Sequence, residues 1–146
     1  MELIDAANEA RGRGRSAADA ESQLETLFGN AGRLAVYGSL APGRENHHVV
    51  APLGGSWATG MVEGDLARYG WGAALGYPAL HLRRGGQAVP VQVLTSEALR
   101  QAWAKLDAFE GKEYRRLLAP VWYPAADPRA LMTVANLYAA AQDPRW

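Results

Sequence analysis

The sequence predicts an α+β fold, a small mixed β-barrel of about six strands with flanking helices. Segments of strand character follow one another from residue 33 to residue 138, without the strand–helix alternation that gives a parallel sheet. One clear amphipathic helix lies among them. The 146 residues, 49% hydrophobic and 21% charged, can bury a core without disulfides or metal ions.

Residues 1–30 differ from the rest and are expected to form an N-terminal helical extension, with the barrel domain over 31–146. They are rich in acidic residues, lack proline and predict two short helices broken around residues 12–14. Gly29 and Asn30 form a plausible helix stop. The apolar positions of the second helix are Leu24, Leu27 and Phe28.

Six strands are predicted after the extension. Five of them cover residues 34–37, 57–69, 88–94, 117–123 and 131–138, and a sixth follows the turn at 76–80 and ends near Leu82. Gly85 and Gly86 suit a hairpin tip. Gly60 and Gly64 inside a strand indicate a bulge, a bend or close backbone approach, and Pro90 indicates an edge or a bulge.

The predicted central helix spans residues 96–109 and ends at Gly111. Its apolar stripe consists of Ser96, Leu99, Trp103, Leu106 and Phe109. Glu110 follows directly, at the negative end of the helix dipole, which disfavours its ionised form and raises its pKa if it is partly buried. Such a carboxyl group can take and return a proton near neutral pH. The alternative is one more surface acid beside a loop.

The stretch "VYGSLAPG" at residues 36–43 predicts a strand that ends in a tight loop. Consecutive backbone N–H groups at Gly38 and Ser39 can form a small concavity that holds a carboxylate or a developing oxyanion. An ordinary turn is the alternative. Ser39 is not in a G-x-S-x-G elbow, so the loop does not indicate a serine hydrolase.

Composition argues against several function classes. The formal net charge is zero, so no overall field attracts nucleic acid or an anionic membrane surface. The run Arg11, Arg13, Arg15 could contact nucleic acid, but acidic neighbours favour a solvated turn. No long apolar segment or secretory signal begins the sequence, so a cytoplasmic location is expected.

Neither a metal nor a cofactor is expected. The chain has no cysteine, and His47 and His48 are adjacent and point to opposite faces if they lie on a strand. The third histidine, His81, completes no metal-ligand spacing. No phosphate-binding or dinucleotide-binding glycine motif is present.

Three motifs in order, "VYGSLAPG" at 36–43, "GYPAL" at 76–80 and "LDAFEGKEYRR" at 106–116, resemble the gamma-glutamylcyclotransferase-like family. This family includes gamma-glutamylamine cyclotransferase and the AIG2-like proteins. The resemblance covers about residues 33–140. It implies a barrel enzyme, of acyltransferase or lyase type, that closes a gamma-glutamyl amine or amide to 5-oxoproline and releases a free amine.

The resemblance also implies roles for single residues. Glu110 matches the acid/base glutamate of the family. The expected substrate-binding residues are Tyr37, Gly38, Ser39, Leu40, Tyr114, Arg116 and Tyr138. The substrate carries its own nucleophile, its α-amine, so the enzyme needs only a base that passes the proton to the leaving amine.

Two departures leave an alternative open. The family often has Val-x-Gly-Glu before the helix, where this chain has Val91 and Gln92 in "VPVQVL". A non-catalytic protein that binds a small molecule or a partner on the same barrel is therefore the second hypothesis. The extension at 1–30 lies outside the resemblance and could cover the barrel, form a homodimer or gate the pocket.

Overall fold

The computed structural model describes residues 2–13, 18–67, 79–124 and 130–140. Its strands are β1 (Arg33–Val36), β2 (Ser56–Ala67), β3 (Ala79–Leu82), β4 (Gln87–Thr95), β5 (Tyr114–Trp122) and β6 (Leu131–Ala140). Its α-helices are α1 (Glu2–Gly12), α2 (Ala18–Phe28) and α4 (Trp103–Glu110). Short 3₁₀ helices cover Asn30–Gly32, His47–Val49, Ala51–Leu53 and Glu97–Gln101.

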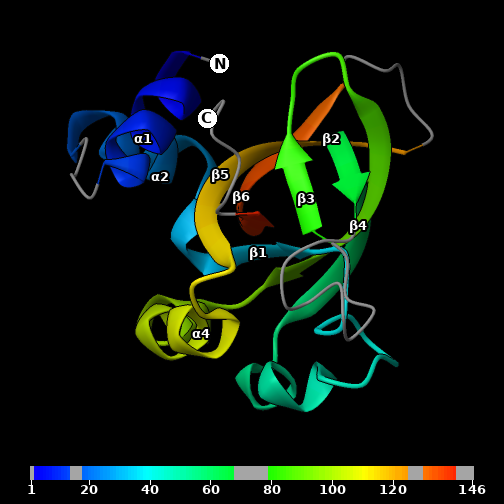
Figure 1. Ribbon diagram of the computed structural model, residues 1–146. Helices are drawn as coiled ribbons and strands as arrows, with labels where there is room; N and C mark the ends of the chain where they lie inside the picture. Colours follow the sequence, from blue (N-terminus) through cyan, green and yellow to red (C-terminus); the bar gives the residue numbers. More distant parts are fainter. Residues whose placement is uncertain (1, 14–17, 68–78, 125–129, 141–146) are drawn as a thin grey trace.

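The strands form a mixed sheet that closes on itself (Figure 1). Their order is β3–β2–β4–β1–β6–β5, and a further pairing of β2 with β5 closes a five-stranded barrel with β3 outside it. Only the pairing of β1 with β6 is parallel among those of the described strands. The α+β barrel predicted from the sequence is confirmed.

Alternate residues of each strand fill the barrel interior, because successive side chains on a strand point to opposite faces. On β4, for example, Val89, Val91 and Val93 are buried inside. The residues of this interior cluster are Ala35, Val62, Leu80, Val89, Val91, Val93, Leu117, Ala119, Val121, Ala135, Leu137 and Ala139.

Two further apolar clusters cover the outside of the barrel. One joins the outer faces of β1, β4 and β6 to α4, through residues such as Val36, Leu94 and Leu106. The other packs α1 and α2 against β5 and β6 through Ile4, Ala7, Ala20, Leu24, Leu118 and Val134. The N-terminal extension therefore covers the barrel, one of the three roles left open by the sequence.

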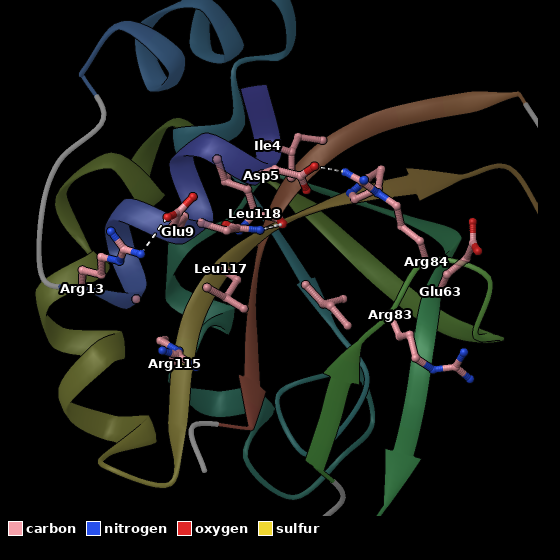
Figure 2. A pocket seen from close by; sticks show the side chains of 14 residues that line it. Ile4, Asp5, Glu9, Arg13, Glu63, Arg83, Arg84, Arg115, Leu117 and Leu118 are labelled. Atoms are coloured by element: carbon pink, nitrogen blue, oxygen red, sulfur yellow. Dashed lines mark hydrogen bonds and ion pairs between the residues drawn. The ribbon is translucent and has the colours of Figure 1, made fainter. Parts of the chain in front are cut away.

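The α1 helix also completes the hydrogen bonding of β5. Asn8 donates its side-chain N–H to the carbonyl of Leu118 at 2.8 Å and accepts the Leu118 N–H at 2.7 Å. Among the described residues β2 pairs with β5 only at Met61 and Trp122, so at Leu118 the Asn8 side chain takes the place of a neighbouring strand. Beside these bonds a cavity of about 470 Å³ separates α1 from the β3–β4 hairpin (Figure 2).

The glycines of β2 allow the close approach that the sequence indicated. A Cβ at Gly60 would lie 2.4 Å from Cγ1 of Val121, and one at Gly64 would lie 2.3 Å from the carbonyl oxygen of His81. Neither position has room for a side chain. The predicted hairpin tip is also confirmed, since Gly85 has a φ of 74°.

The sequence predicted which segments form strands more accurately than it predicted the residues at which the strands begin and end. The strand expected at 117–123 begins three residues earlier, at Tyr114, and the last strand continues to Ala140. Pro90 lies near an edge, as the sequence indicated, because at this position β4 pairs with β2 alone. Its ladder with β1 begins only at Gln92, so the missing N–H of Pro90 breaks no hydrogen bond to β1.

The single helix expected over 96–109 is wrong in its first half. Ser96 does cap the segment by accepting the Ala98 N–H, but a 3₁₀ helix follows and α4 begins only at Trp103. Phe109 is 43% exposed, contrary to expectation. Leu106 marks the buried face of α4. Glu110, four residues later, lies on this face, whereas Phe109, three residues later, lies beside it.

The extension forms the two predicted helices, and Gly29 ends the second with a φ of 62°. Leu27 was wrongly assigned to the apolar face, since it is 66% exposed. Arg11 and Arg13 form ion pairs with Glu21 and Glu9. Arg15 and the first three residues of the "GYPAL" motif lie outside the described residues.

Candidate active site

Strand register brings the predicted site segments to one end of the barrel. The parallel pairing of Ala35 with Leu137 places the loop that follows β1 beside the last residues of β6. The antiparallel pairing of Tyr114 with Ala140 places the start of β5 at the same end. The loop after β1 and the turn between α4 and β5 therefore lie at the same end of the barrel.

The loop after β1 is held by the residues that follow it. Asn46 donates its backbone N–H to the Ser39 carbonyl at 2.9 Å and its side-chain N–H to the Ser39 hydroxyl at 2.8 Å. His47 donates from Nδ1 to the Leu40 carbonyl at 2.9 Å. Since a carbonyl can only accept, this bond places the imidazole proton on Nδ1. These bonds fix the loop backbone.

The N–H groups of Gly38, Ser39 and Leu40 have no acceptor among the described residues. The Gly38 carbonyl accepts from Ala41 at 3.2 Å, which closes the turn. A fixed turn with successive N–H groups left for a ligand suits an anionic group. The loop therefore has the donors that a carboxylate or an oxyanion needs.

Tyr37 lies inside the barrel wall. Its hydroxyl donates to the main-chain carbonyl of Tyr138 at 2.6 Å and accepts the Leu80 N–H at 3.1 Å. Its side chain packs against the interior apolar cluster. The residue thus links β6 to β3 and holds the start of the loop against the barrel.

Glu110 is the last residue of α4 and lies on its inward face. It is partly buried, and Gly111 ends the helix with a φ of 74° and an N–H that donates to the Asp107 carbonyl at 3.0 Å. No described residue donates a hydrogen bond to the Glu110 carboxyl group or forms an ion pair with it. A partly buried carboxyl without a cation is costly when ionised.

Burial raises the pKa of Glu110 to about 7. The raised pKa predicted from the sequence is confirmed, and its cause is loss of water around the carboxyl. At neutral pH this group is divided between its two protonation states. It can therefore accept a proton and return it without a large energetic penalty.

Tyr138 and Arg116 meet at Asp107, one turn before Glu110. The Tyr138 hydroxyl donates to Asp107 Oδ1 at 2.5 Å, and the Arg116 guanidinium donates to both carboxylate oxygens at 3.0 and 3.3 Å. Burial, and then the bond to Asp107, raise the pKa of Tyr138, and the nearby charge of Glu110 raises it further. Tyr138 therefore lies near Glu110, and its hydroxyl is hydrogen-bonded to Asp107 of α4.

Tyr114 opens β5 directly after the turn. It is partly buried against the apolar cluster that includes Leu40, Leu106 and Tyr138, so this cluster joins the loop, the helix and the last strand. Its N–H donates to the Gly111 carbonyl at 3.4 Å. The predicted residues at 37–40, 110, 114, 116 and 138 therefore gather in one region of the structure.

Three supporting residues were not predicted. Asn46 and His47 hold the loop, and Asp107 holds the helix, but sequence reasoning considered only His47, as a metal ligand. Asp107 gave no signal in the sequence, because its side chain is 44% exposed on α4 and resembles an ordinary surface acid. Asn46 carried no local signal.

Val91 and Gln92 do not share a face. Val91 is buried inside the barrel, whereas Gln92 lies outside and exchanges side-chain hydrogen bonds with Thr59 on β2. Of the two departures from the family pattern, Gln92 therefore does not line the barrel interior. Adjacent residues of a strand point to opposite sides, so only Val91 can affect the interior.

The described residues contain no group of three or more His, Asp or Glu side chains placed to hold a metal ion. His47 instead packs against the Trp57 ring, with centroids 5.5 Å apart. Among the helices that the structure describes, none is long and apolar enough to cross a membrane.

Comparison with solved structures supports this fold. A mouse AIG2-like protein matches at a TM-score of 0.59 and 24% identity, over 79% of this chain and 81% of that one. An uncharacterized protein of Pyrococcus horikoshii matches at 0.54 and 19% identity, over 77% and 80%. A protein of Arabidopsis thaliana matches at 0.52 and 20% identity, over 77% and 72%.

Sequence comparison assigns the family. No curated protein matches the chain significantly. The model of the family "Gamma-glutamyl cyclotransferase, AIG2-like" matches residues 34–145, which is the barrel without the two N-terminal helices. The match covers most of the chain and includes the Tyr37–Leu40 loop and Glu110. This chain therefore belongs to the gamma-glutamyl cyclotransferase, AIG2-like family.

Proposed function

We propose that this protein cyclises a gamma-glutamyl amine or amide, releasing 5-oxoproline and a free amine, with Glu110 as the general acid and base. Family membership supports a cyclotransferase-type function in general. The single observation that carries the proposal is the carboxyl group of Glu110, partly buried, without a described partner and with a pKa of about 7. It stands at the same end of the barrel as the Gly38–Leu40 loop.

The reaction is an acyl transfer within the substrate. Glu110 takes a proton from the α-ammonium group, and the freed amine attacks the gamma-carbonyl carbon to close a five-membered ring. Glu110 then returns the proton to the leaving nitrogen as the bond from that carbon to this nitrogen breaks. The ring nitrogen gives up its second proton to the carboxylate of Glu110, which passes it to the released amine, so that the products are the neutral lactam and an ammonium ion. Because the nucleophile belongs to the substrate, the chain needs no serine or cysteine nucleophile.

The loop after β1 provides the second half of the site. The N–H groups of Gly38, Ser39 and Leu40 can hold the α-carboxylate of the gamma-glutamyl group, as the family resemblance implies. Such anchoring orients the α-amine toward the carbonyl carbon, which favours ring closure. The bonds from Asn46 and His47 keep the loop in place before substrate arrives.

The test is a 5-oxoproline assay with a panel of gamma-glutamyl amines, amides and dipeptides. We expect turnover by the wild-type protein and a loss of at least about 10²-fold in Glu110→Gln, which cannot carry the proton. Glu97→Gln is the matched control, because Glu97 is 85% exposed on the neighbouring 3₁₀ helix. Full activity of Glu110→Gln would refute the mechanism.

The same assay separates the second hypothesis. A protein that binds a gamma-glutamyl compound in calorimetry, with no 5-oxoproline formed from any member of the panel, would be a binding protein on the same barrel. In that outcome the proposed enzymatic function is wrong.

A further inference from the structure

Arg11, in the last turn of α1, ties the N-terminal helices to the barrel. Its Nε and Nη2 donate to the two carboxylate oxygens of Glu21 in α2 at 3.0 and 2.6 Å. Its Nη1 donates to Oδ1 of Asn136 in β6 at 2.7 Å. The side chain is only 16% exposed, and a two-pronged pairing of this kind fixes the plane of the guanidinium.

Asn136 also accepts a hydrogen bond from a second arginine, Arg116. Its side chain is buried, and its Oδ1 accepts from Arg11 and also from Nη1 of Arg116 at 3.4 Å. Its own N–H donates to the Asn30 carbonyl at 2.7 Å, which prevents the amide from turning. Two guanidinium groups therefore share one fixed, buried oxygen, and the position of each depends on the other.

Arg116 carries the connection to the helix of the proposed active site. It binds both oxygens of Asp107 and lies over the ring of Trp103, 4.6 Å from its centroid. Asp107 is three residues before Glu110, and its carbonyl accepts the N–H that ends the helix at Gly111. The network thus runs from α2 to the turn that carries Glu110.

The last turn of α4 borders a cavity on its outer side, and there side-chain hydrogen bonds hold it in place of apolar packing. A cavity of about 560 Å³ is lined by Arg11, Glu21, Asp107, Gly111, Tyr114, Arg115, Arg116 and Tyr138. The network has a carboxylate at each end, Glu21 and Asp107, each paired with one arginine, and the two arginines meet at the neutral side chain of Asn136. Because water reaches this side of α4, side-chain bonds must fix the last turn.

We propose that Arg11 is a positioning residue for Glu110, acting through Asn136, Arg116 and Asp107. The inference rests on the proposed function of Glu110 as acid and base. The family match begins at residue 34, so this support comes from a part of the chain outside the family domain. The N-terminal helices then belong to the working enzyme as well as covering the barrel.

Loss of Arg11 has a defined consequence in this network. The Asn136 oxygen loses its shorter bond, so Arg116 shifts toward it and its bonds to Asp107 lengthen. The last turn of α4 is then held less firmly, and Glu110 is misplaced relative to the reacting nitrogen. The loop at 38–40, which holds the α-carboxylate in the proposed function, is untouched, so the chemical step slows more than substrate binding weakens.

The experiment compares Arg11→Met with Arg13→Met in the full chain. Arg13 is on the same helix but is 61% exposed and pairs only with Glu9 among the described residues. We expect Arg11→Met to lower kcat by about tenfold with KM changed less than about twofold, because a small misplacement costs rate more than binding. Arg13→Met should match the wild type, and Arg11→Lys, which keeps the charge, should recover part of the loss.

A double variant tests the route. On an Asp107→Asn background, Arg11→Met should cost less than about twofold, since residues that act through one another are not additive. If the loss of kcat in the double variant equals the product of the losses in the two single variants, Arg11 acts by another route and the proposal is overturned. Equal losses in Arg11→Met and Arg13→Met would overturn it too. Circular dichroism confirms that each variant is folded at the assay temperature.

A readout without turnover separates this inference from the proposed function. A carbon-13 NMR titration follows the Glu110 carboxyl, whose pKa should fall toward its ordinary value in Arg11→Met as the loosened turn exposes it to water. It should stay unchanged in Arg13→Met. If the wild type turns over no gamma-glutamyl compound, the proposed function fails, and this titration alone supports or overturns the positioning network.

Discussion

The hydroxyl of Tyr138 donates a hydrogen bond of 2.5 Å to the Asp107 carboxylate. This bond joins the last strand of the barrel to the helix that ends in Glu110. The main-chain carbonyl of the same Tyr138 accepts the Tyr37 hydroxyl at 2.6 Å, so this residue also holds the start of the loop after β1. Tyr138 therefore connects the two halves of the proposed site, although its hydroxyl is occupied by Asp107.

We expect Tyr138→Phe to lower the free energy of unfolding by about 1–2 kcal/mol, because it removes a hydrogen bond to a charged group whose acceptor is partly reached by water. Urea denaturation at pH 7 measures this change. Tyr123→Phe is the control, since Tyr123 is half exposed at the end of β5. If the two variants unfold at the same urea concentration, the Tyr138–Asp107 bond does not stabilise the fold.

We expect Glu110→Gln to stabilise the protein above neutral pH. The folded-state pKa of Glu110 is about 7, above the 4.5 of a fully hydrated glutamate, so the folded protein binds this proton more tightly than the unfolded chain. The favourable contribution is complete below pH 4.5 and is lost as the pH rises through 7. Gln stays neutral, so at pH 8 the variant should gain roughly 3 kcal/mol relative to wild type.

The measurement is the difference in unfolding free energy between Glu110→Gln and wild type, taken from pH 5 to pH 8. This difference should grow in favour of the variant with pH, whereas Glu97→Gln, on the exposed 3₁₀ helix, should not follow the same course. A pH-independent difference at Glu110 would mean that its carboxyl is as well solvated in the folded state as in the unfolded one.

Local patterns predicted the elements of this fold, and contacts between them decided the details. The strand at 88–94 and the hairpin tip at Gly85 and Gly86 were both predicted, since their signals depend on neighbouring residues alone. The helix was misjudged because Phe109 was assigned to the stripe by hydrophobicity. In the structure Glu110, and not Phe109, occupies the inward position on α4. An acidic side chain on the buried face of a helix is unusual, and the proposed site rests on it.

The two halves of the proposed site were predicted from their motifs, but the residues that support them were not. Arg11 and Asn136 lie far apart in the sequence, and each has an ordinary local context. Their partnership depends on how α1 packs on β6, which no periodicity encodes. Asp107 likewise resembles a solvent-facing acid until β5 places Arg116 opposite it.

We expect Gln92→Glu, which restores the residue common in the family, to leave kcat/KM within about twofold of wild type. Gln92 lies on the outside of β4 and bonds Thr59, so a charge there does not reach the barrel interior. The 5-oxoproline assay measures the effect. A large gain in activity would instead mean that position 92 influences the substrate.

We expect Asn8→Ala to lower the free energy of unfolding by about 1–3 kcal/mol, because it leaves the N–H and carbonyl of the buried Leu118 without their partner. The cavity beside α1 admits water to this place, which favours the lower part of that range (Figure 2). Glu9→Ala, at an exposed position of the same helix, is the control. Hydrogen exchange gives the site-specific readout: the Leu118 amide should exchange faster in Asn8→Ala alone, and unchanged exchange would show that α1 does not complete the edge of β5.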